Sequence, residues 1–287
     1  MKRFLGGLVL GEAVQASLLG HWLRPVVRAT HPLMGYSLRF RLATQAVERP
    51  HYAYCMIRGA ELARRLGHSH ISAIEFGVAG GNGLRVMCDL AAEIEREIGV
   101  RYTCWGFDTG KGMPPPQGPR DLPYWFQEAQ YVMDEPALRA RVPEARLVLG
   151  DIAETVGDFV ARERPAPIAA IFNDTDYFSS TMESFRLFDA VPAHPEAFLP
   201  RIFCYFDDVI GSDYEMYCSV NGQLAAIEEF NARKGPVQIA LNQNLMNRPS
   251  LRYAMHIYYA HLFDHPDYAT YVGAERQKHL QDALKLR

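Results

Sequence analysis

The sequence predicts an α/β protein built on a doubly wound, mostly parallel seven-stranded sheet with a helical N-terminal extension. Short apolar runs alternate with segments of helical periodicity along most of the 287 residues. A glycine-rich turn follows the first apolar run, and acidic residues follow several of the others. These patterns are typical of a parallel sheet that is covered by helices on both faces and binds a ligand at the carboxyl ends of its strands.

The expected N-terminal extension covers residues 1–50. It starts with a basic and then apolar run that is similar to a signal peptide, but Glu12 and Gln15 interrupt the run. The run is also too short and too polar to span a bilayer. We expect an amphipathic helix, broken near Pro25 and Pro32, that packs on the domain, on a partner subunit or on a membrane surface as a peripheral contact.

One domain is expected over residues 51–287. Each predicted strand is a short apolar run, and each predicted helix repeats apolar residues every three or four positions. Gly67 and Gly99 end the first two helices. The last two strands follow each other without a helix, so one of them is expected to be antiparallel. The predicted helices are Tyr52–Leu66, Leu84–Ile98, Ile152–Arg162, Met182–Phe188 and Asn221–Arg233, and the predicted strands are Ile71–Phe76, Tyr102–Phe107, Arg146–Leu149, Ile168–Phe172, Ile202–Phe206, Val237–Leu241 and Leu251–Tyr259.

The composition is ordinary for a soluble globular enzyme. Apolar residues make up 48% and charged residues 22% of the chain, and the formal net charge of −3 does not favour nucleic acid as a partner. The five cysteines show no metal-ligand spacing and no C-x-x-C pair. We therefore expect reduced thiols and a cytoplasmic location.

The glycine-rich turn runs from Glu75 to Gly83 and joins a predicted strand to a predicted helix. Gly77 and Gly81, which flank Val78, permit a tight turn and a close approach of a cofactor to the backbone. The spacing differs from the GxGxxG fingerprint of nicotinamide-binding proteins. Glu75 at the strand end suits the amino group of a cofactor that carries an amino acid. The alternative is a turn without a ligand.

Two further aspartates follow the next strands. Asp108, before Thr109, can accept hydrogen bonds from both ribose hydroxyls of a nucleoside cofactor, or it can be a turn or cap residue. Asp151, before Ile152, can contact an adenine amine or cap the following helix. Both alternatives stay open on the sequence alone.

Acidic residues also follow the fourth and fifth predicted strands. Asp174 lies after one, and Asp207 and Asp208 lie after the other. Parallel strands bring these carboxylates to one edge of the sheet, where they repel each other unless a cation or protons neutralise them. Hard oxygen ligands favour Mg²⁺, with Mn²⁺ or Ca²⁺ as alternatives. The other interpretation is that they cap helices or are solvated.

These motifs resemble those of class I S-adenosylmethionine-dependent methyltransferases, and most closely the macrocin (tylosin-type) O-methyltransferase family. The resemblance runs from about Pro50 to about Gly211 and rests on IEFGVAGGNG, GFDTGKGMP, and DTDYFSST followed by FDD. It implies a Rossmann-like methyltransferase fold. It also implies Mg²⁺ bound as in catechol O-methyltransferases, by Asp174, Asp207 and Asp208. The implied S-adenosylmethionine site comprises Glu75, Gly77, Val78, Gly81, Asp108, Thr109, Asp151 and Ile152.

Tyr177 and Asp176 are the two candidates for the catalytic base. Related metal-dependent enzymes often have Lys or His three residues after the first metal-binding aspartate, and Tyr177 occupies that position here. A tyrosine is a poor base at neutral pH, so Asp176 and activation by the metal alone are the alternatives.

The resemblance implies a Mg²⁺-dependent O-methyltransferase that acts on a hydroxyl of a sugar, a glycoside or another small polar natural product. The aromatic stretch Met113–Phe126 is expected to form a wall for this acceptor or to pack as core. A homo-oligomer is expected. The alternative functions are a nicotinamide-dependent oxidoreductase and a non-catalytic S-adenosylmethionine-binding protein.

Overall fold

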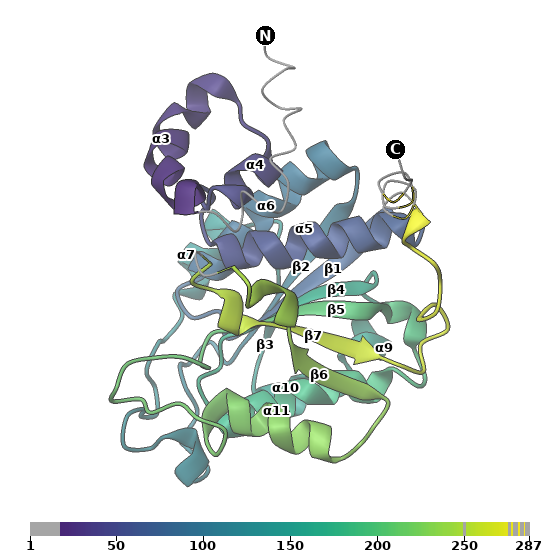
Figure 1. The fold of residues 1–287 in the computed structure, drawn as a ribbon. Coiled ribbons are helices and arrows are strands. Elements are labelled where there is room, and N and C mark those ends of the chain that lie inside the picture. Colours follow the sequence, from purple (N-terminus) through teal and green to yellow (C-terminus); the bar gives the residue numbers. More distant parts are fainter. Residues whose placement is uncertain (1–17, 249–250, 275–276, 278–280, 282–283, 285–287) are drawn as a thin grey trace.

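The computed structural model describes residues 18–248, 251–274, 277, 281 and 284. Its centre is a seven-stranded sheet with the strand order β3-β2-β1-β4-β5-β7-β6 (Figure 1). The first five strands are parallel, and β7 is antiparallel to β5 and β6. The predicted doubly wound, mostly parallel seven-stranded α/β sheet is therefore confirmed. The strands are β1 (His70–Phe76), β2 (Arg101–Asp108), β3 (Arg146–Leu149), β4 (Ile168–Asn173), β5 (Phe198–Phe206), β6 (Val237–Leu241) and β7 (Ile257–Leu262).

Helices cover both faces of the sheet. In Figure 1, α5 and α6 lie on one face and α10 and α11 on the other. Side chains of β1 alternate between the two cores, with Ala73 on the α5 side and Ile74 on the opposite side. The helices are α3 (Leu18–Met34), α4 (Leu38–Ala43), α5 (Pro50–Arg65), α6 (Asn82–Ile98), α7 (Glu135–Arg141), α8 (Ile152–Thr155), α9 (Phe159–Glu163), α10 (Phe178–Ser184) and α11 (Gly222–Ala232).

The N-terminal region differs from its prediction. The expected breaks near Pro25 and Pro32 are wrong, because α3 continues through both prolines. A proline removes one backbone donor and bends a helix without always ending it. Contacts with residues 46–47 help to hold this helix in place, since Arg28 donates to the carbonyls of Ala46 and Val47 at 3.4 and 3.3 Å. Residues 1–17, which hold most of the predicted amphipathic helix, lie outside the described residues.

Other boundaries also differ from their predictions, including the start of β5, which lies at Phe198 and not at Ile202. The predicted helix Ile152–Arg162 is two short helices, α8 and α9, separated around Gly157, where a glycine weakens the helix. The predicted helix Met182–Phe188 starts earlier, as α10, and continues as a 3₁₀ helix from Phe185 to Ala190. The last predicted strand starts only at Ile257, because the apolar residues before it pack into the core from a turn.

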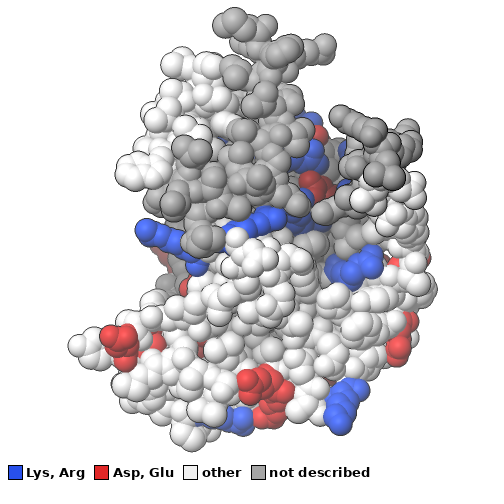
Figure 2. Space-filling view, viewed as in Figure 1, with Lys and Arg blue, Asp and Glu red and all other residues white. Residues whose placement is uncertain are grey.

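Charged side chains are dispersed on the face of the molecule that Figure 2 shows. On the face in Figure 2, basic and acidic side chains form small separate groups on a mostly uncharged surface. Within the described part of the chain, no helix combines the length and apolar character required to cross a bilayer.

Candidate active site

A cavity of about 410 Å³ opens at the carboxyl ends of the parallel strands. Strands β1 to β5 each contribute residues at or just after their ends, which is where ligands bind in open α/β sheets. Most of the residues predicted for the site meet here, although they are spread over 134 positions of sequence from Glu75 to Asp208. Those that line the cavity are Glu75, Gly77, Val78, Asp108, Thr109, Asp151, Ile152, Asp174, Asp176, Asp207 and Asp208.

The glycine turn touches the end of β4. Gly77 has a φ of +85°, a conformation that L side chains rarely adopt. A Cβ at Gly77 would lie 1.8 Å from the carbonyl oxygen of Asp174, so no side chain fits between the two segments. The backbone N–H of Asp174 donates to the Phe76 carbonyl at 2.9 Å. The turn and the first acidic cluster are therefore packed against each other.

Gly81 lies in the turn but does not line the cavity. It precedes α6 with a φ of +76°, and a Cβ there would lie 2.1 Å from Cδ1 of Leu138. The structure thus gives Gly81 a role in packing α7 against the start of α6. The positive φ and the contact with Leu138, and not contact with a ligand, require a glycine at this position.

Glu75 is buried at the inner wall of the cavity, with 1% of its surface exposed. Its Oε1 accepts a hydrogen bond of 2.6 Å from the Tyr52 hydroxyl, whereas its Oε2 is buried without a partner in the described structure. Burial raises the pKa of Glu75 to about 7. A buried carboxylate oxygen without a donor fits a ligand that brings a cationic donor, as an ammonium group does.

Asp108 braces the glycine turn. Its Oδ2 accepts from the backbone N–H groups of Val78 and Ala79, both at 2.9 Å, and its Oδ1 accepts from Gly110 at 2.7 Å. The turn role weighed for this residue is thus observed. A carboxylate offers about four acceptor sites, so Asp108 can still accept a bond from a ligand in the cavity.

Asp151 caps α8, as the second alternative for this residue predicted. Its Oδ1 accepts from the backbone N–H of Ala153 at 2.9 Å, and the residue is exposed at the rim of the cavity. The adjacent Ile152 is buried and contributes apolar lining. The cap fixes the carboxylate in place without using all of its acceptor sites.

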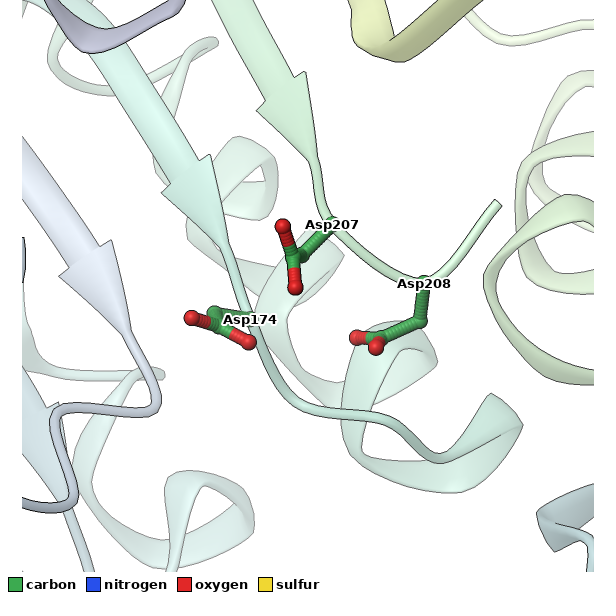
Figure 3. Close-up of side chains that lie close together, drawn as sticks. All are labelled: Asp174, Asp207 and Asp208. Atoms are coloured by element: carbon green, nitrogen blue, oxygen red, sulfur yellow. The ribbon is translucent and has the colours of Figure 1, made fainter. Parts of the chain in front are cut away.

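The three predicted metal-binding aspartates converge. Figure 3 shows Asp174 at the end of β4 facing Asp207 and Asp208 at the end of β5. One carboxylate oxygen from each lies within 4.8 Å of the others. Burial, followed by the neighbouring carboxylates, raises the pKa values of Asp174 and Asp208 well above their usual range. A hard divalent cation fits this donor set because it would supply the missing positive charge.

A surrounding layer of donors orients these carboxylates. The Tyr205 hydroxyl donates to Oδ1 of Asp207, and the backbone N–H of Asp176 donates to Oδ2 of Asp208 at 2.9 Å. Gln223 is fully buried; its Oε1 accepts from the N–H of Asp208 at 2.9 Å, and its side-chain amide donates to the Asn173 carbonyl at 3.1 Å. Sequence reasoning missed Tyr205 and Gln223. Of the two, only Tyr205 could have been suspected from the sequence, because it lies two residues before Asp207.

The two candidates for the base are placed differently. Asp176 lines the cavity, and burial followed by the charge of Asp174 raises its pKa to about 7. Tyr177 does not line the cavity and is fully buried beside Leu122 and Phe126. Burial raises the pKa of Tyr177 to about 12. The structure therefore does not bring the predicted catalytic Tyr177 to the site.

The aromatic stretch Met113–Phe126 was expected either to form a wall for the acceptor or to pack as core, and its residues are placed differently. Phe126 is buried and lines the cavity, whereas Trp125 is exposed and stacks on Tyr214 with ring centroids 6.1 Å apart. Tyr131 and Glu215 also line the cavity. Two loops, one after β2 and one after β5, thus form the outer wall.

Arg49 is a further lining residue that sequence reasoning missed. It precedes α5 at the boundary of the expected N-terminal extension, where no motif draws attention to it. It is half-buried and supplies positive charge to a cavity whose other charged lining residues, among those described, are all Asp or Glu.

No protein-family model matches the chain, and no curated protein matches it in sequence. Solved structures that resemble it include the O-methyltransferase NovP, with a TM-score of 0.47 and 16% identity over 71% of this chain and 76% of that chain. The calicheamicin methyltransferase CalS11 has a TM-score of 0.45 and 18% identity over 86% of this chain and 92% of that chain.

Proposed function

We propose that this chain is an S-adenosylmethionine-dependent O-methyltransferase that uses a divalent cation, Mg²⁺ by preference. The observation that carries the proposal is the joining, in one cavity, of a nucleoside-type site with a cluster of three carboxylates. A nucleoside site alone would suit many cofactors. The adjacent cluster of carboxylate oxygens can hold a cation that activates a hydroxyl.

The cofactor is proposed to lie along the carboxyl ends of β1 to β3. Asp108 and Asp151 line the part of the cavity suited to the nucleoside, and Ile152 supplies apolar contact there. Glu75, with its unpartnered Oε2, suits the ammonium group of the amino-acid end. Gly77 and Val78 allow the ligand to approach the backbone between these two ends.

Asp174, Asp207 and Asp208 would hold the cation. When bound, S-adenosylmethionine supplies a methyl group on a positively charged sulfur, and the cation lowers the pKa of a hydroxyl brought to it. Transfer of this methyl group to the acceptor oxygen would leave S-adenosylhomocysteine as the second product. The hydroxyl proton goes to the Asp176 carboxylate, which is the better-placed of the two candidates because it lines the cavity and Tyr177 does not.

The acceptor is proposed to be a sugar hydroxyl on a glycoside or another small polar natural product, as in the macrocin-type family. The aromatic Phe126 and Tyr131 and the carboxylate of Glu215 line the outer cavity, a combination that suits a sugar ring. Four other expectations stay predictions. They are a homo-oligomer, a cytoplasmic location, the absence of nucleic acid as a partner, and the division into an extension over residues 1–50 and a domain over residues 51–287.

Methyl transfer from labelled S-adenosylmethionine to a panel of hydroxylated glycosides and phenols tests this function. We expect transfer to stop in EDTA and to return when Mg²⁺ is added. Transfer that continues unchanged in EDTA would contradict the metal requirement while leaving the methyltransferase assignment in place.

A further inference from the structure

We propose that Arg49 binds the α-carboxylate of the cofactor's amino-acid end, opposite the Glu75 carboxylate. The cavity then recognises both charges of a zwitterionic amino acid. This inference rests on the proposed function and deepens it, because it assigns to the site a residue outside the motifs.

Arg49 lies on the same wall of the cavity as Glu75. It is the residue before α5, and its guanidinium carbon is 5.1 Å from the centre of the Tyr52 ring. The hydroxyl of that ring donates to Oε1 of Glu75 at 2.6 Å. Tyr52 is fully buried, so it fixes the spacing between the positive and the negative group.

The guanidinium is available to a ligand. In the described part of the chain, the Arg49 side chain forms no hydrogen bond or ion pair; its guanidinium lies against the Tyr52 ring, and Glu75 and Asp174 act on it electrostatically. A half-buried guanidinium without an acceptor is costly, and a carboxylate can satisfy it with two parallel hydrogen bonds. Its backbone φ of +44° lies in the left-handed region, which is unfavourable for a residue with a side chain and common where function requires it.

Charge balance also favours a carboxylate here. Among the described residues that line the cavity, Arg49 is the one Arg or Lys, and the other charged groups are all Asp or Glu. An anion without a positive group beside it would be repelled by these carboxylates. An amino acid instead carries its ammonium and its carboxylate on the same α-carbon, which matches Glu75 and Arg49 on one wall of the cavity.

Calorimetric titration with two ligands tests the inference. S-Adenosylhomocysteine contains the amino-acid end, and 5′-methylthioadenosine lacks it. We expect Arg49→Ala and Arg49→Gln to weaken S-adenosylhomocysteine binding by about 10- to 100-fold and to leave 5′-methylthioadenosine binding unchanged. The control is Arg85→Ala, because Arg85 pairs with Glu48 and Asp89 outside the cavity and should leave both affinities unchanged.

Each other outcome has a distinct meaning. Unchanged S-adenosylhomocysteine binding by both Arg49 variants would overturn the inference. An equal loss of both ligands would also overturn it, because it would show that Arg49 only maintains the cavity. Failure of the unmodified protein to bind S-adenosylhomocysteine would instead contradict the proposed function itself.

Discussion

Replacement of Asp174 by asparagine should abolish tight divalent-cation binding and reduce methyl transfer by at least about 100-fold. Asparagine keeps the size of the side chain but removes one of three negative charges that lie within 4.8 Å of each other. The same change removes repulsion from Asp208 and Asp207, which helps to raise the pKa of Asp174. The metal-free variant should therefore be at least as stable as the unmodified protein.

Titration with Mn²⁺, followed by electron paramagnetic resonance, measures the cation site without requiring the acceptor. Asp213→Asn is the matched control, since Asp213 is exposed in the loop after β5 and does not line the cavity. Mn²⁺ binding that survives Asp174→Asn at full affinity would exclude Asp174 as a ligand. A loss of folding in the variant would contradict the repulsion argument.

Replacement of Gly77 by alanine should lower the free energy of unfolding by roughly 2 to 6 kcal/mol and abolish cofactor binding. Two costs add at this position. The backbone φ of +85° is strained for any residue with a Cβ, and that Cβ would lie 1.8 Å from the backbone oxygen of Asp174. Because the added Cβ would clash with a backbone atom and not with a movable side chain, the turn and the end of β4 would have to separate to remove the clash.

Gly80→Ala is the control for this prediction. Gly80 lies in the same turn, but a Cβ there would meet no atom within 4 Å. Urea unfolding of the two variants should show a large shift of the midpoint for Gly77→Ala and little change for Gly80→Ala. Equal stability of the two would show that the turn is not packed against β4 as described.

The strands were the part of the fold most open to prediction. The bounds predicted for β3 and β6 coincide with those in the structure, and β1, β2 and β4 each extend the predicted run by one or two residues. Strands of a parallel sheet are buried on both faces, so they read as continuous apolar runs. The convergence of Asp174 with Asp207 and Asp208 followed from topology alone, because parallel strands end at one edge.

Residues whose roles depend on side-chain packing could not be predicted in this way. Gln223 orients Asp208 from the start of α11, 15 positions further along the chain, and nothing in its local sequence indicates this. Tyr177 lies beside Asp176 in the chain, yet the two side chains enter different environments. Arg49 acquires its place from the way α5 packs on the sheet.

Calorimetric titration of the unmodified protein with S-adenosylmethionine and, separately, with NADH tests the central claim most directly. Both ligands carry an adenosine, so Asp108 and Asp151 alone would not distinguish them, whereas Glu75 suits the amino-acid end of S-adenosylmethionine. We predict one molecule of S-adenosylmethionine bound per chain and no binding of NADH. Binding of NADH without binding of S-adenosylmethionine would contradict the proposed function.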